Sequence, residues 1–223
     1  MSAVTENPQR LLARLTGAIL VLSLLTGALG YLLLDKVARD QARELTLVDS
    51  WLTAADLART AQVHYKIQVQ EWKNVLLRGE LGAGFAHHRQ AMEQQGRLVQ
   101  DQLGRLRMQL AANPEVAEEV RVLAAAAEDV LAVYEDQLQG REVLGPDQAR
   151  SIDQAVRGVD RELDQRLHAL TAALRARGEQ ERLHAGTEGL ATTQRAKWVL
   201  LGGTLLQILA LVVMLSLVLR HRH

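Results

Sequence analysis

The chain has 223 residues, with 26 basic and 26 acidic side chains and no cysteine. This balance leaves no global field that would attract nucleic acid or an acidic substrate, and the lack of cysteine excludes disulfides, thiolate metal sites and cysteine catalysis. The apolar residues are mostly Leu, Ala and Val, with only 3 Pro and 1 Phe, a composition that favours helices.

Two long uncharged segments lie near the ends of the chain, at residues 15–34 and 198–219. Each matches the roughly 20 residues needed to cross the hydrocarbon core of a bilayer. Tyr31 and Trp198 lie near segment ends, where amphipathic rings prefer the interface. The alternative for the first segment is a signal peptide cleaved at Ala28-Leu29-Gly30, but its apolar run exceeds the usual length of about 7–15 residues. We therefore expect two transmembrane helices with both termini on one side.

Basic residues flank both spans on both sides, so the positive-inside comparison does not orient the chain. The pairs compared are Arg10 and Arg14 against Lys36, Arg39 and Arg43, and Arg220 and Arg222 against Arg195 and Lys197. Glycines in the spans would allow close contact between helices. They include Gly27, Gly30, Gly202 and Gly203.

The segment after the first span, residues 35–77, has no turn signal before Arg78-Gly79 and predicts one long helix continuous with that span. Two groups of apolar residues recur three or four positions apart, which places each group on one face, and the second continues a stripe related to the first. The first group is Leu45, Val48, Leu52 and Ala55, and the second is Tyr65, Val69, Trp72 and Leu76. Gly79 suits the C′ position just beyond the helix, where a left-handed backbone is common.

Three further helices are predicted at residues 85–111, 115–139 and 147–197. The glycine-rich residues 79–84 precede the second helix, and X-Pro pairs at 113–114 and 145–146 mark the starts of the third and fourth. Each helix carries an apolar stripe. The stripes are Phe85, His88, Met92, Val99, Leu103, Leu106 and Leu110; Val116, Val120, Leu123, Ala127, Val130 and Tyr134; and Ile152, Val156, Val159, Leu163, Leu167, Leu170 and Leu174.

Four amphipathic helices with short links predict an all-α fold, an antiparallel up-down-up-down four-helix bundle with coiled-coil spacing. The bundle would occupy residues 35–197 between the two transmembrane helices, and its first and fourth helices would form a membrane-proximal stalk. Gly178, Gly186 and Gly189 weaken the end of the fourth helix. We interpret that stretch either as a frayed linker or as a compliant joint that lets the fourth helix move against the first.

The end of the first helix combines a large aromatic anchor with several polar groups. Its segment runs Gln68-Val69-Gln70-Glu71-Trp72-Lys73-Asn74-Val75-Leu76-Leu77-Arg78-Gly79. Its charges are either a solvated helix flank, the default at a bundle edge, or part of a small-ligand site between helices near the tip. The candidate ligand-binding residues are Tyr65, Gln68, Glu71, Trp72, Lys73 and Arg78.

The histidines of the central region are scattered, and none are spaced as a helical ligand pair. His64 and His88 are weak candidates for a shared metal site across the glycine-rich turn. Surface or partly buried histidines without metal are the alternative, and we expect no cofactor. No phosphate loop, nucleophile elbow or metalloprotease pattern occurs, and no basic patch with aromatics indicates nucleic acid. We therefore expect neither enzymatic activity nor nucleic-acid binding.

The Gln68–Gly79 segment, extended back through Ala61, resembles the end of the first sensory helix of bacterial methyl-accepting chemotaxis receptors. About 20 residues carry the close similarity, and the rest agrees in architecture. The resemblance implies a homodimer of the bacterial inner membrane that acts in signal transduction. It implies that residues 35–197 are periplasmic and that the termini, 1–14 and 220–223, are cytoplasmic. Such receptors continue into a HAMP linker and a cytoplasmic signalling hairpin. This chain ends at His223, so we expect a sensory region lacking both, which is either a stand-alone sensory half that acts through another membrane protein or a fragment of a receptor.

The resulting hypothesis is a membrane-anchored, chemoreceptor-like sensory module. It would detect a small ligand or partner in the periplasm and pass a helix displacement across the membrane to an unidentified membrane or signalling protein. The first alternative is a structural membrane-anchored scaffold without a ligand. A metal- or haem-binding bundle is the second alternative.

Overall fold

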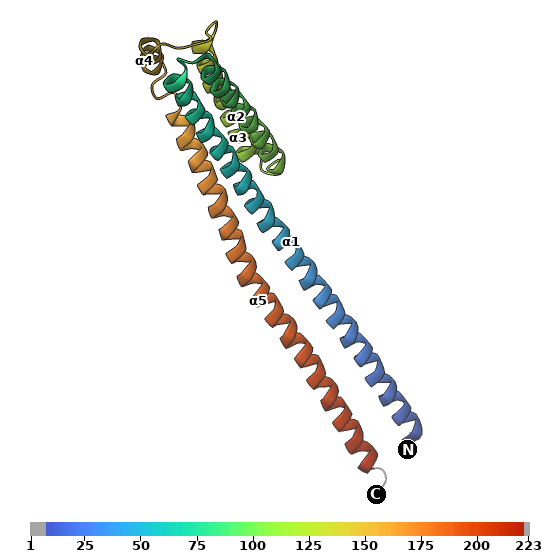
Figure 1. Cartoon of the computed structure of the whole chain (residues 1–223). Coiled ribbons are helices and arrows are strands. Elements are labelled where there is room, and N and C mark those ends of the chain that lie inside the picture. Colours follow the sequence, from blue (N-terminus) through green and yellow to red (C-terminus); the bar gives the residue numbers. More distant parts are fainter. Residues whose placement is uncertain (1–7, 221–223) are drawn as a thin grey trace. The chain divides into compact units, whose positions relative to one another are not determined.

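The computed structural model describes residues 8–220, and helices make up all the regular secondary structure in that range (Figure 1). They are α1 (Pro8–Arg78), α2 (Gly82–Gln109), α3 (Pro114–Leu138), α4 (Pro146–Ala155) and α5 (Arg161–Arg220). The all-α prediction is therefore confirmed. The chain divides into two compact units, one formed by Met1–Thr46 with Glu181–His223 and the other by Leu47–Gln180.

The first unit holds the two apolar segments, which are long and apolar enough to cross a membrane. Two of the predicted glycines lie where these helices approach closely. A Cβ on Gly30 would lie 2.6 Å from Leu200 Cδ2, and one on Gly203 would lie 2.6 Å from Thr26 Cγ2. Small residues permit such approaches between helix backbones. By contrast, Gly27 and Gly202 would gain no contact within 4 Å.

The second unit, Leu47–Gln180, is built around one cluster of buried apolar side chains that come from α1, α2, α3, α4 and α5. In Figure 1, α2 and α3 run side by side as a hairpin, and these two helices contact each other extensively. Most of the predicted stripes point into this cluster. The buried members include Phe85, Met92, Val99, Leu103, Leu106, Val120, Leu123, Tyr134, Leu163, Leu167, Leu170 and Leu174.

In the N-terminal group of the stripe predicted for the first helix, two of the residues expected to face the core are exposed. Leu45 and Leu52 are 68% and 47% exposed, whereas Ala54, Ala58 and Ala61 are fully buried. Alanines occupy the inner face because helices can approach each other more closely over short side chains than over leucines. This part of α1, from Ala54 to Ala61, therefore contacts the core through small residues that carry little weight in a hydrophobicity pattern.

The single helix predicted at 147–197 is instead two helices, α4 and α5. Helix α4 ends at Ala155, and Gly158 takes a φ of +88° before α5 begins at Arg161. A positive φ is favourable only for glycine and ends a right-handed helix. The later glycines, including Gly186 and Gly189, lie within the continuous helix α5. Whether that stretch is compliant stays a prediction.

The turn between α1 and α2 is tightly packed rather than left-handed. Gly79 directly follows the last residue of α1, as expected, but it is not among the glycines with positive φ. A Cβ at Gly79 would instead collide with the Val75 carbonyl oxygen and press on Leu144 and Phe85. The Leu144 amide donates a 2.8 Å hydrogen bond to the Gly79 carbonyl. Glycine is needed at position 79 for this close approach.

Candidate functional site

The structure does not gather the six candidate ligand-binding residues around one open cavity. Tyr65, Gln68 and Trp72 lie within the core, with exposed fractions of 0%, 0% and 3%. Lys73 and Arg78 are exposed at the end of α1, and the Glu71 side chain is 21% exposed. The helix period explains this division, because positions 65, 68 and 72 share the inner face of α1. Only the remaining positions can meet a ligand without disturbing the core.

Trp72 is held by an aromatic partner on α3. Its ring stacks on Tyr134 with a centroid distance of 4.2 Å and an interplanar angle of 4°. Burial raises the pKa of the Tyr134 phenol. Stacked aromatic pairs add about 0.5–1.5 kcal/mol beyond the burial of their area. Trp72 is therefore a core anchor that joins α1 to α3.

Gln68 lies one turn before Trp72 and has no exposed surface. Neither the oxygen nor the nitrogen of its amide finds a hydrogen-bond partner among the described residues. Gly96 of α2 lies opposite, where a Cβ would come within 3.6 Å of Gln68 Oε1 and 2.7 Å of Leu131 Cδ2. The lack of a side chain at Gly96 thus makes room for Leu131, while Gln68 Oε1 lies at an ordinary contact distance from that position.

Glu71 forms a side-chain hydrogen bond that links α1 to α2. Its carboxylate accepts a 2.7 Å hydrogen bond from His88 Nδ1 and a 3.3 Å bond from Asn74. Burial raises the pKa of the Glu71 carboxyl, but the hydrogen bonds from His88 and Asn74 outweigh it, so the pKa falls below its ordinary value. The His88 ring also meets the His87 ring edge-on at 5.0 Å. The pair fastens α2 to the end of α1.

The lowered pKa of Glu71 predicts an acid-sensitive contribution to stability. Because the pKa is lower in the folded chain than in the unfolded one, the carboxylate stabilises the fold above the ordinary value of 4.5. That contribution is lost as the pH falls through the lowered value. We expect Glu71→Gln to lower the melting temperature at neutral pH and to match the wild type in acid. Melting curves from about pH 7 to about pH 3 would check this.

Glu80→Gln is the control for that series, because Glu80 is an exposed carboxylate just beyond the same helix end. Its melting temperature should follow the wild type at every pH. A constant difference between Glu71→Gln and the wild type across the whole range would contradict the role of ionised Glu71.

The two histidines proposed as a metal pair have separate partners. His64 Nδ1 donates a 2.8 Å hydrogen bond to Gln95 Oε1, whereas His88 pairs with Glu71. Among the described residues, no group of three or more His, Cys, Asp or Glu side chains is arranged to hold a metal ion. The geometry therefore gives no support to a shared site at His64 and His88.

A small polar cavity of about 280 Å³ lies between α1 and the start of α5. Tyr65 and Lys73, two of the candidate residues, line it, and the Tyr65 hydroxyl donates a 3.1 Å hydrogen bond to the Asp160 carbonyl. Burial raises the pKa of this phenol, so it stays a donor at physiological pH. The charged residues in the wall are Lys66, Lys73, Asp160, Arg161 and Asp164.

Lys73 also borders a second cavity, of about 450 Å³, between the end of α1 and α4. Its other walls include Leu76, Leu77 and Arg150. Lys73 is thus the candidate residue that reaches open space on both sides of the α1 end. The exposed edge of α1 near Lys73 is therefore the candidate ligand site. The buried Trp72, stacked on Tyr134, supports this part of α1 from the core side.

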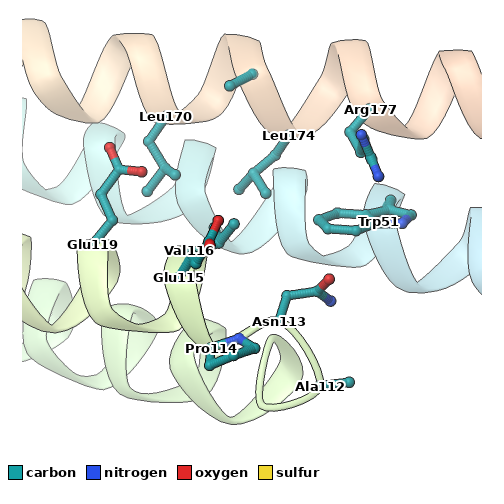
Figure 2. Close-up of a pocket in the computed structure, with 11 residues that line it drawn as sticks. Trp51, Ala112, Asn113, Pro114, Glu115, Val116, Glu119, Leu170, Leu174 and Arg177 are labelled. Carbon is teal, nitrogen blue, oxygen red and sulfur yellow. The ribbon is translucent and has the colours of Figure 1, made fainter.

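A further cavity of about 500 Å³ lies beside the loop that joins α2 to α3, and none of the six candidate ligand-binding residues lines it. Figure 2 shows Trp51 of α1, Glu119 of α3, and Leu170, Leu174 and Arg177 of α5 around this space. These residues are far apart in the sequence and share no motif. Only the meeting of three helices brings them together.

The chain is a partial homologue of a methyl-accepting chemotaxis protein. It is 32% identical over 191 residues to the methyl-accepting chemotaxis protein CtpH of Pseudomonas aeruginosa, a match that covers 83% of this chain and 33% of that protein. The chain thus spans about a third of the length of its relative. No protein-family model matches the chain, and no solved structure matches it.

Proposed function

We propose that this chain is a chemoreceptor-like sensory module. In this proposal residues 35–197 are a periplasmic four-helix bundle set between transmembrane helices at 15–34 and 198–219 of the bacterial inner membrane. The observation that carries it is the similarity to a methyl-accepting chemotaxis protein over 83% of the chain. Two apolar segments that could cross a membrane support the same reading. Both termini would be cytoplasmic, the protein would be a homodimer, and it would have no enzymatic activity.

The arrangement of α1 and α5 suggests how such a module would respond. Lys73 belongs to α1 and Arg161 to α5, and both line the same cavity of about 280 Å³. Each of these helices continues into one apolar segment. A ligand changes the relative position of two helices only if it binds one arrangement better than the other. A small polar ligand that reaches both Lys73 and Arg161 in only one arrangement would meet that condition, and the displacement would pass to another membrane or signalling protein.

A thermal-shift screen of the full chain in detergent tests this proposal. The ligands are amino acids, organic acids, oxyanions and metal ions. A ligand at about 100 times its dissociation constant adds about 2.7 kcal/mol, which raises the melting temperature by roughly 5–10 °C for a domain of this size. We expect Lys73→Gln to abolish the shift, since its ammonium lines both cavities near the end of α1.

Arg97→Gln is the matched control, because it removes one exposed positive charge from α2, outside both cavities. It should keep the full shift. No shift with any ligand, together with a stable partner in a pull-down, would support the scaffold alternative instead. Orientation needs a separate test: a reporter fused after His223 that is active only outside the cytoplasm would overturn the proposed topology.

A further inference from the structure

The cavity at the foot of the α2–α3 hairpin has an apolar floor and a charged edge. Leu170 and Leu174 of α5 and Val116 of α3 form the floor, and both leucines are buried. Its volume of about 500 Å³ lies within the usual range of small-molecule sites, about 300–1,000 Å³. Such sites combine apolar walls with a few polar groups that fix the ligand's orientation.

The charged edge is dominated by two carboxylates. Glu115 and Glu119 lie one turn apart on α3 and both line the cavity. Neither forms an ion pair with any residue in the described part of the chain, whereas neighbouring Glu118 is bound by Arg121 at 2.7 Å. Two like charges four residues apart weaken a helix by about 0.2–0.5 kcal/mol. A cation between them would remove this repulsion.

One positive charge opposes the two negative charges of the wall. The Arg177 guanidinium lies 5.8 Å from the centroid of the half-buried Trp51 ring. Figure 2 shows it beside the indole at one end of the cavity, while Leu170 and Glu119 lie toward the other end. The lining side chains thus carry a net negative charge at neutral pH, which favours a cationic ligand over an anionic one.

We propose that this cavity binds a small organic cation of the amine class. Its ammonium group lies between Glu115 and Glu119, and its hydrocarbon part lies on Leu170, Leu174 and Val116. The site is separate from the one near Lys73 and goes beyond the proposed function. Because its walls come from α1, α3 and α5, an occupant contacts the same two helices that lead into the apolar segments.

Isothermal titration of the full chain in detergent tests the inference with three probes of matched shape. They are phenethylammonium, 2-phenylethanol and 3-phenylpropionate, which share a phenyl group and a short chain but differ in charge. We expect phenethylammonium to bind most tightly. The double variant Glu115→Gln/Glu119→Gln should weaken its binding about tenfold, equivalent to about 1.4 kcal/mol. Both side chains are exposed, so these changes should not disturb folding.

Glu128→Gln is the matched control, since it removes a carboxylate from an exposed position of the same helix outside the cavity. It should leave the affinity unchanged. Equal affinity for phenethylammonium and 2-phenylethanol, undiminished affinity in the double variant, or no binding of phenethylammonium would each overturn the inference. Any of these results leaves the proposed function standing if another ligand still gives a thermal shift that depends on Lys73. Lys73 does not line this cavity.

Discussion

Replacing Trp72 with alanine is expected to lower the free energy of unfolding by about 3–5 kcal/mol, the range found when a buried large aromatic is truncated. The indole is 3% exposed and stacks on Tyr134 at 4.2 Å, so its removal leaves a cavity and an unpaired ring. Urea unfolding of the full chain in detergent, followed by far-ultraviolet circular dichroism, would measure the loss.

Leu77→Ala is the control for Trp72→Ala, because Leu77 is 78% exposed on the same last turns of α1. It should change the free energy of unfolding by less than about 0.5 kcal/mol. A double-mutant cycle with Tyr134→Ala should return a coupling energy of about 0.5–1.5 kcal/mol. A loss below about 1 kcal/mol for Trp72→Ala would contradict its place in the core. Such a small loss would mean that the indole is accessible, and it would favour direct contact of the indole with a ligand instead.

The expected size of this loss also decides how the site can be tested. Trp72→Ala would remove ligand binding simply by unfolding the region, so a lost response would not distinguish sensing from structure. Lys73 is exposed and lines open space, so its substitution tests binding with little cost in stability. From the sequence, the tryptophan is the conspicuous residue of this segment. The structure makes its polar neighbour the more informative one.

The sequence predicted helices well where large apolar side chains carry the period. In α3, Val120, Leu123, Val130 and Tyr134 were all expected to point inward, and all are buried. In α1 the inner face is marked by Ala58 and its neighbouring alanines, which resemble surface residues in a hydrophobicity pattern. Close packing between helices depends on small side chains, whereas the stripe was predicted from the positions of large apolar side chains, so it could not detect this face.

The break between α4 and α5 was missed for a different reason. Val156, Val159 and Leu163 keep a helical spacing straight through the turn, so periodicity gave no sign of an interruption. Gly158 was the available signal, because glycine alone accepts the φ of +88° found there. The carbonyl of Asp160 in this turn accepts the Tyr65 hydrogen bond, so the missed break also shapes a candidate cavity.

The cavity walls could not have been predicted from one sequence. Trp51, Glu119 and Leu174 share no motif, and their meeting depends on how far each helix is rotated about its axis. A stripe fixes that rotation only approximately, as the exposure of Leu52 shows. The candidate residues near Trp72 were found because they are adjacent along the chain. Their division between core and surface then follows from the helix period.

Replacing Gln68 with methionine is expected to raise the free energy of unfolding by about 1–3 kcal/mol, the cost of a buried polar group without a hydrogen bond. Methionine has nearly the same length and adapts to irregular gaps, so it should fill the space opposite Gly96. Urea unfolding of the full chain would measure the gain. Gln70→Met is the control, since Gln70 is exposed two residues away, and should change stability by less than about 0.5 kcal/mol.

A loss of more than about 1 kcal/mol in Gln68→Met would contradict this account and would show that the amide is hydrogen-bonded in solution. A gain would have a consequence for function. A side chain that lowers stability at the centre of a well-packed layer is expected where activity, rather than folding, requires it. Gln68 lies one turn from both Trp72 and the Glu71–His88 pair, where α1, α2 and α3 meet. An amide without a hydrogen bond raises the free energy of the present helix arrangement. The difference in free energy from an alternative arrangement in which the amide is hydrogen-bonded is then smaller, as a bundle that responds to a ligand requires.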